Sequence, residues 1–368
     1  MSDELKALVT DLVDGRADEW DRAGEIPIDL VRQLGRKGLL CPEVPARFGG
    51  LGMTSLQNGE FTAHVGSLCS SLRSLMTSQG MAAWAIRRFG SVEQRAHYLS
   101  RLTSGELVGI AFSESGAGSD LAAMSTTIRL DGDSVVVNGA KIWVTGAGYA
   151  DMVVVIGRFG DADGAAAVVV PVDAEGVTVR RVPDPLGCRA AGHSDVDLDE
   201  VRLPADALLH GAGQPLQMLI TSALTYGRVS VAWGCVGILR ACLNATARHA
   251  KAREQFGKPL VEHQLVGRHL AELLVSEQVA TRTSEHASRL WDEGSPEMIT
   301  AAVVAKHVSA GNAASGASSA VQVLASAGAG DGHVVARAYR DAKLMEIIEG
   351  SNEICQLVLA KHALVVAS

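Results

Sequence analysis

The chain has 368 residues, of which 47% are hydrophobic and 20% charged, and its formal net charge is −8 at pH 7. This composition is typical of a folded protein with a large apolar core and excludes extensive disorder. The acidic balance and the lack of a long basic run disfavour a nucleic-acid partner, because such binding needs a concentrated basic face.

The six cysteines are scattered without a C-x-x-C pair, which is typical of reduced thiols and not of a disulfide framework or a metal site. The first residues form an amphipathic segment and not an apolar signal region. We find no stretch that approaches the ~20 uninterrupted apolar residues of a membrane span. We therefore expect a cytoplasmic protein with no membrane association and no metal.

The first part of the chain, residues 1–107, has helical periodicity. Leu5, Leu8, Val9 and Leu12 follow the spacing of one buried helical face. A capping-box pattern, Ser91 followed by Gln94, predicts that another helix begins there.

Residues 108–212 have the sequence pattern of β-strands and not of helices. Short β-branched runs at 134–137, 152–156, 167–170 and 177–179 alternate with turn signals such as Asn138-Gly139. Their close spacing without intervening helices predicts antiparallel strands in a small barrel or sandwich. From residue 213 to 368 the helical period returns, so the chain reads as α+β in three domains.

Two segments of the middle domain carry polar groups suited to a cofactor. The glycine-rich turn from Ser113 to Asp120 exposes backbone N–H groups and hydroxyls that could hold a phosphate or a ring edge, although such a loop can also be purely structural. Trp143 and Thr145 lie two residues apart on a predicted strand and would face the same side. They could hold a planar ring, or be an ordinary core Trp beside a surface Thr.

Two further segments lie in the C-terminal domain. Arg253 precedes a helix-breaking Gly-Lys-Pro and is a natural partner for a diphosphate, and His263 and Gln264 follow it. Glu349 comes after an apolar helical run and directly before Gly350. If it is buried there, its pKa rises and it can act as a general base, whereas a lone Glu is more often a solvated surface residue.

In this order the four segments resemble the acyl-CoA dehydrogenase family, whose members carry T-E-P-G-A-G-S-D, N-G-x-K-x-W-I-T-N, R-x-x-F-G-x-x-x-x-x-x-Q and Y-E-G-T-x-x-I-x-R. Their counterparts here are 113–120, 138–146, 253–264 and 348–354. R-D-A-K at 340–343 and D-E-V-R-L-P at 199–204 add to a likeness that covers nearly the whole chain.

The resemblance implies an N-terminal helical domain (1–107), a middle β-barrel domain (108–212) and a C-terminal four-helix bundle (213–368), with FAD bound between the subunits of a homodimer or homotetramer. It implies that Glu349 removes the α-proton of an acyl thioester while a hydride passes from the β-carbon to flavin N5. The residues expected to bind the cofactor are Phe112, Ser113, Ser119, Trp143, Thr145, Arg253, Phe256, Gln264, Gln322, Ser351 and Glu353. Those expected to bind the substrate are Ser119, Arg228 and Gly350.

The chain also departs from the family pattern. Thr225 stands where several CoA-using members have an acid that contacts the carrier, and Gly227 leaves the family's alternative base position empty. In these features the sequence resembles one branch of the family, whose substrates are held on an acyl carrier protein. Its members oxidise a small oxygenated three-carbon acyl group toward a hydroxymalonyl unit for polyketide synthesis.

Other functions remain open at this stage. On the same fold, the chain could be a flavin oxidase or monooxygenase, or a short-chain acyl-CoA dehydrogenase of catabolism. A nucleic-acid-binding flavoprotein of this fold is disfavoured by the net charge. The electron acceptor, an electron-transfer flavoprotein or oxygen, is left open, as is the choice between CoA and a carrier protein.

Overall fold

The N-terminal part of the computed structural model, which describes residues 2–160 and 164–366, is helical as the apolar spacing predicts. Val9 and Val13 are buried on the inner face of the first helix. The predicted capping box forms, since the Gln94 N–H donates to Ser91 Oγ at 3.2 Å and the Ser91 N–H donates to Gln94 Oε1 at 2.9 Å. The helices are α1 (Ser2–Val13), α2 (Ala17–Ala23), α3 (Ile28–Arg36), α4 (Ser55–Leu68), α5 (Ser70–Phe89) and α6 (Val92–Thr103).

The β-branched runs all form strands, and they join one sheet in the order β6-β7-β3-β2-β4-β5-β8, with β1 beside β4. The strands are β1 (Val108–Ala111), β2 (Thr127–Asp131), β3 (Ser134–Val144), β4 (Met152–Phe159), β5 (Gly164–Pro171), β6 (Val177–Arg181), β7 (Ser194–Pro204) and β8 (Gln214–Pro215). The pairs β1–β4 and β2–β4 are parallel, against the antiparallel prediction. Strand spacing alone did not reveal them, because these partners are separated by other segments. The predicted barrel is an open one, since its path ends at β6 and β8.

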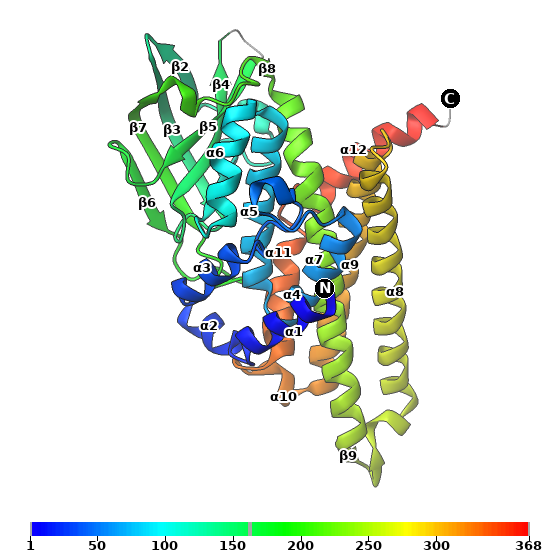
Figure 1. Ribbon diagram of the computed structural model, residues 1–368. Coiled ribbons are helices and arrows are strands. Elements are labelled where there is room, and N and C mark those ends of the chain that lie inside the picture. Colours follow the sequence, from blue (N-terminus) through cyan, green and yellow to red (C-terminus); the bar gives the residue numbers. More distant parts are fainter. Residues whose placement is uncertain (1, 161–163, 367–368) are drawn as a thin grey trace.

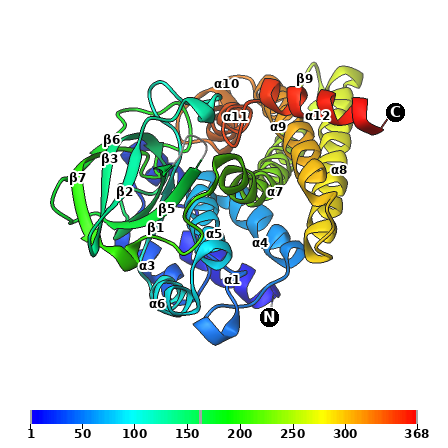
Figure 2. The ribbon, with the colours of Figure 1, turned by 90° about the horizontal axis from the view of Figure 1, so that it is seen from above.

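The C-terminal part is a bundle of long helices with a short hairpin of β9 (Glu254–Gln255) and β10 (Lys258–Pro259). Its helices are α7 (Leu216–Ala252), α8 (Gln264–Asp292), α9 (Met298–Leu324), α10 (Ser326–Ala329), α11 (Val334–Met345) and α12 (Asn352–Val366). Figure 2 shows α7 in the middle, with the sheet on one side and α8 and α9 on the other.

Glycines let α7 approach α4 closely. A Cβ on Gly59 would lie 2.1 Å from Trp233 Nε1, and one on Gly237 would lie 2.3 Å from the Ala63 carbonyl oxygen. By length and composition α7 could cross a membrane, but 78% of its most apolar window is buried inside the protein. Such burial is the property of a core helix. Figure 1 shows the sheet beside one end of α7 and the β9–β10 hairpin at the other end.

Candidate active site

Glu349 lies in the tight connection between α11 and α12, where the apolar helical run ends as predicted. The residue adopts φ 55° and Gly350 follows at φ 89°. A left-handed conformation costs a non-glycine residue about 1–3 kcal/mol, so neighbouring contacts must hold it there.

Two buried cations from neighbouring helices hold this connection. Arg228 of α7 donates from Nε to the Glu349 carbonyl oxygen at 3.0 Å. Lys306 of α9 donates from Nζ to the carbonyl oxygens of Gly350 at 2.7 Å and Glu346 at 3.2 Å. Each cation donates to carbonyl groups of the segment that connects the two helices, where regular helical hydrogen bonding is interrupted.

The Glu349 carboxylate occupies a space that Gly227 leaves open. A Cβ on Gly227 would lie 2.4 Å from Glu349 Oε2 and 2.8 Å from the sulfur of Met81. Oε2 is buried and has no hydrogen-bond partner within residues 2–160 and 164–366. The carboxylate is thus closely confined and yet has an oxygen atom free to accept a proton.

Burial raises the pKa of Glu349 from 4.5 to about 7, and the charges of Arg228, Lys306 and Arg73 limit the rise. The carboxyl group therefore has the buried environment that a general base needs, and the role of Glu349 as that base stays a prediction. A carboxyl that titrates near neutrality is suited to general base chemistry.

A second wall of the site contains Trp143 and Thr145. Trp143 is 47% exposed, adopts φ 56° and has its ring centroid 5.6 Å from that of His193. Val144 between them is buried, so the burial pattern agrees with the prediction that Trp143 and Thr145 face the same side. His193 connects the two, because Thr145 Oγ1 lies 3.2 Å from His193 Nδ1.

His193 is held in its neutral form. Burial lowers its pKa to about 4, and the charges of Arg73 and Arg181 act in the same direction. Its Nε2 atom is buried and unpartnered in the described part of the chain. The wall therefore offers an indole face, a hydroxyl and a free ring nitrogen to a planar polar ring.

An ion pair fixes the turn that follows β1. Lys141 Nζ donates to Glu114 Oε1 at 2.8 Å and to the Phe112 carbonyl oxygen at 3.1 Å, and both side chains are buried. Burial opposes ionisation of Glu114, but hydrogen bonds from Lys141, Ser125 and Thr126 outweigh it and lower its pKa to about 2. This pair sets Phe112 and Ser113 beside β3, where the Ile142 N–H donates to the Ser113 carbonyl oxygen at 2.9 Å.

Helix α5 joins the two walls. Ser78 Oγ donates to the Thr145 carbonyl oxygen at 2.8 Å, and Met81, one turn further along, lies beside Gly227 and Glu349. The structure thus brings Thr145 and Glu349 to one stretch of α5, with Trp143 connected through His193 and Arg228 held against the Glu349 carbonyl oxygen.

The remaining predicted cofactor residues lie elsewhere in the chain. Arg253 and Phe256 belong to the hairpin at the far end of α7 from the sheet (Figure 1), and Phe256 is 95% exposed. Gln264 at the start of α8 and Gln322 near the end of α9 are exposed too. Ser119 is exposed on the turn after β1, Ser351 is half-buried and Glu353 is exposed at the start of α12. One chain therefore does not gather all of these residues around a single cofactor.

Family models for the N-terminal, middle and C-terminal domains of acyl-CoA dehydrogenases match residues 1–106, 109–201 and 218–364. The chain belongs to the acyl-CoA dehydrogenase family. It is thus an FAD-dependent oxidoreductase of a family that acts on acyl thioesters. The Trp143 face and the unpartnered His193 nitrogen fit a flavin ring, so we expect this wall and the Phe112–Ser113 turn to hold it.

Three relatives place the chain within the acyl-CoA dehydrogenase family. The structure of FkbI, for biosynthesis of the methoxymalonyl extender unit of the Fk520 polyketide immunosuppressant, is 60% identical with a TM-score of 0.94, covering 98% of this chain and 99% of that one. A probable acyl-CoA dehydrogenase of Bacillus subtilis, YngJ, is 33% identical over 95% of this chain and 93% of its own length. The human mitochondrial short-chain specific acyl-CoA dehydrogenase is 32% identical over 95% of this chain and 85% of its own length.

Sequence reasoning missed several residues of the site. Lys306 and His193 lie outside the four motifs, and Lys141 lies within the 138–146 motif but was given no role; each matters because of a partner distant along the chain. The signal available was weak: a Lys or His within an apolar segment indicates a buried polar group that must have a partner.

Proposed function

We propose that this protein oxidises a small oxygenated acyl group that is delivered as a thioester on an acyl carrier protein, and that Glu349 removes the α-proton. The observation that carries the proposal is the 60% identity with FkbI over almost the whole chain, well above the 32% shared with the human short-chain enzyme. On this proposal the protein acts in the cytoplasm, in the formation of an extender unit for polyketide synthesis.

The proposed reaction uses groups that the site leaves unpaired. Glu349 Oε2 takes the α-proton, and the electron pair of that C–H bond moves toward the thioester carbonyl. The Glu349 N–H has no acceptor within residues 2–160 and 164–366, so it can donate to the carbonyl oxygen as negative charge develops. FAD, when bound, supplies the acceptor for the hydride that leaves the β-carbon. Confining Glu349 between Gly227 and Arg228 fixes the direction of attack.

The choice of a carrier protein over CoA rests partly on Thr225. Its side chain is buried and Oγ1 donates to the Thr221 carbonyl oxygen at 2.6 Å, so the hydroxyl is already used within α7. An acidic carrier protein would favour exposed arginines on this net-negative enzyme.

Two arginine pairs are candidates for that docking surface. Arg87 is half-buried, donates to the Glu43 carbonyl oxygen at 3.0 Å and stacks on Trp84, and Arg180 pairs with Asp197. Arg88, Arg180 and Arg181 are exposed, and of these Arg180 is already paired with a carboxylate.

Anaerobic stopped-flow reduction of the bound flavin tests the carrier. One acyl group is presented on a carrier protein, on CoA and on pantetheine at equal concentration. The carrier-linked form should react fastest, and added salt should reduce its advantage over pantetheine. Equal rates with all three, or an advantage that does not respond to salt, would contradict a carrier-protein substrate. Reversal of the charge of Arg88 and of Arg181, one at a time, then identifies the docking face.

The cofactor is proposed to lie across a subunit interface. The hairpin with Arg253 and Phe256 is remote from the Trp143 wall of its own chain, so a second copy must supply it if both contact one FAD. Exposed apolar side chains on two helices support such an assembly: Leu265, Leu274, Val275, Val279, Leu357 and Val358. A dimer or a tetramer would bury them, and sedimentation at several concentrations distinguishes the two. A monomer that retains one FAD per chain would contradict the shared site.

A second candidate is catabolic short-chain acyl-CoA oxidation, which the 32% identity with the human short-chain enzyme supports. It predicts that butyryl-CoA reduces the flavin at least as fast as any carrier-linked oxygenated group.

The electron acceptor is a separate question. If the protein is an oxidase, its reduced flavin should be reoxidised rapidly in air after reduction by the substrate. Following reoxidation with and without an electron-transfer flavoprotein identifies the electron acceptor.

A further inference from the structure

His193 and Thr145 face each other across two strands of the sheet. Val144 at the end of β3 is paired with Ser194 at the start of β7, so the next residue on each side comes opposite the other. Thr145 Oγ1 lies 3.2 Å from His193 Nδ1, which is the one partner of this hydroxyl among the described residues. The ring of His193 is 8% exposed and lies beside the indole of Trp143. The pair is therefore part of the wall that we expect to hold the flavin ring.

The backbone around the pair is fixed by further hydrogen bonds. The Gly146 N–H donates to the Ala191 carbonyl oxygen at 3.0 Å, which joins the two segments just beyond the pair. Ser78 Oγ of α5 donates to the Thr145 carbonyl oxygen at 2.8 Å. The hydroxyl and the imidazole thus meet in a set orientation, because neither segment can turn without leaving these buried groups unpaired.

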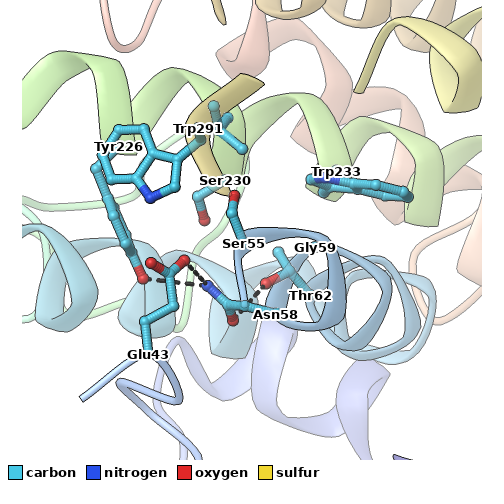
Figure 3. Close-up of a pocket in the computed structure, with 10 residues that line it drawn as sticks. Glu43, Ser55, Asn58, Gly59, Thr62, Tyr226, Ser230, Trp233 and Trp291 are labelled. Atoms are coloured by element: carbon cyan, nitrogen blue, oxygen red, sulfur yellow. Dashed lines mark hydrogen bonds between the residues drawn. The ribbon is translucent and has the colours of Figure 1, made fainter. Parts of the chain in front are cut away.

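Arg73 of α5 is a buried cation whose charge acts on the His193 ring. Its Nη1 atom donates to Thr77 Oγ1 at 3.3 Å, and Thr77 Oγ1 lies 2.7 Å from Ser230 Oγ. Ser230 lines the small cavity of Figure 3, so a chain of hydroxyls that begins at this cavity anchors the guanidinium. Burial and the charges of Arg73 and Arg181 lower the pKa of His193 to about 4. Near neutral pH the ring is therefore uncharged, and only one of its two nitrogens carries a proton.

The unpartnered nitrogen indicates where that proton is. His193 Nε2 is buried and has no hydrogen-bond partner within residues 2–160 and 164–366. A proton on Nε2 would leave a buried N–H without an acceptor, which is rare in folded proteins. The positive charge of Arg73 also favours a lone pair on the ring over an N–H. The proton therefore belongs on Nδ1, the nitrogen that faces Thr145 Oγ1.

We infer that His193 is a positioning residue, which donates from Nδ1 to Thr145 Oγ1 and thereby directs the proton of the Thr145 hydroxyl toward the flavin ring. A hydroxyl has one proton and can accept and donate at the same time. Because its oxygen accepts from His193, its proton is free for a third group. With the His193 proton on Nε2, the hydroxyl would instead donate to Nδ1 and could only accept from the cofactor. The inference goes beyond the proposed function and does not depend on the acyl group or its carrier.

This direction of the hydrogen bond favours reduced FAD. A hydrogen bond that is donated to the ring becomes stronger as the ring gains electrons, because electron-rich acceptors bind donors more tightly. The difference between a neutral and a charged acceptor corresponds to about a three- to tenfold preference for the reduced cofactor. For a two-electron couple this ratio is equivalent to roughly 15–30 mV in midpoint potential.

The midpoint potential of the bound FAD, measured without substrate by equilibrium titration against a reference dye, tests the inference. His193→Phe removes the donor and should lower the potential by roughly 15–30 mV. His193→Asn places an amide N–H near the position of Nδ1 and should keep the native potential. His193→Gln places its amide near Nε2 and should resemble His193→Phe. If His193→Phe retains no FAD, the Asn and Gln variants alone decide the question.

A second substitution separates this role from a general effect on folding. Thr145→Val should lower the potential by itself, and His193→Phe should then add no further shift, because the two residues act as one unit. The matched control is His64→Phe. His64 Nε2 lies 3.0 Å from Thr10 Oγ1 in a similar pair between α4 and α1, outside the sheet. This control should leave the potential unchanged.

Several results would overturn the inference. A native potential in His193→Phe or in Thr145→Val would mean that the hydroxyl does not donate to the flavin. Equal potentials in the Asn and Gln variants, or a loss confined to the Asn variant, would mean that the Nδ1 proton is not the one that matters. A shift from His193→Phe that persists in the Thr145→Val background would mean that His193 acts without the hydroxyl. No acyl thioester is present in these measurements, so such a failure is distinct from a failure of the proposed function.

Discussion

The Glu349 connection and the β9–β10 hairpin are both assigned to the same site, yet they differ in every physical respect. Glu349 is half-buried with its Oε2 atom fully buried, and its connection is held by cations from α7 and α9. Phe256 in the hairpin is 95% exposed at φ 52°, on strands of two residues each. Burying a Phe side chain is worth about 1.5–3 kcal/mol, which this chain alone does not gain. On the proposed assignment, the residues for proton transfer all come from one chain, whereas cofactor binding would need the hairpin of a second one.

The largest expected effect is the loss of flavin reduction when Glu349 is replaced. Glu349→Gln should retain the fold and the bound flavin but reduce the rate of flavin reduction by at least ~100-fold, the usual contribution of a general base. Stopped-flow absorbance measures this. Glu43→Gln is the matched control, because burial also raises the pKa of Glu43 to about 7. Native rates in the Glu349 variant, or an equal loss in both, would remove Glu349 from its assigned role.

The hairpin should respond differently. Arg253→Ala should weaken FAD retention by ~10-fold or more, because a diphosphate loses a charge-assisted partner, and should leave the flavin-reduction rate of loaded enzyme nearly unchanged. Equilibrium dialysis measures FAD affinity, with the exposed Arg248→Ala as control. Mixing Arg253→Ala protomers with Glu349→Gln protomers should restore some fully intact sites. No recovery after subunit exchange would contradict a shared site.

Gly227→Ala tests whether close packing against α7 holds the Glu349 carboxylate in place. The added methyl would lie within 2.4 Å of the Glu349 carboxylate, so the base must move, and we expect a loss of about tenfold in flavin reduction without loss of FAD. Gly267→Ala, whose Cβ meets nothing within 4 Å, is the control. An unchanged rate would mean that the carboxylate is not confined as described.

The smallest effect is a shift in pH dependence. Because Glu349 must be ionised to accept a proton and its pKa is about 7, flavin reduction should rise as pH increases through 7. Lys306→Met removes a charge that lowers this pKa, so the rise should move to higher pH by less than ~1 unit. Rates measured from pH 5.5 to 9 test the direction. A rise at lower pH than in the native protein would show that Lys306 does not act on the carboxyl charge.

What the sequence predicted depended on whether the signal was local. Capping at Ser91, the β-branched strands and the helix end before Glu349 depend on neighbours along the chain, and all are present. The parallel pairing of β1 with β4 and the ion pair of Lys141 with Glu114 depend on segments that meet only after folding. Arg73 is the extreme case, because its surroundings come from α5, α7 and α11 together.

The space shared by Gly227 and Glu349 has a consequence for the divergence of such enzymes. Only one carboxylate fits in this space. Its side chain could be attached to the backbone of α7 at position 227 or, as here, to the α11–α12 connection at position 349. A base could therefore change its position in the sequence while keeping its place in the molecule, provided that the two changes occur together. Gly227 and Glu349 should be inherited as a pair, and an exchange of the two side chains is the shortest path between the alternative arrangements.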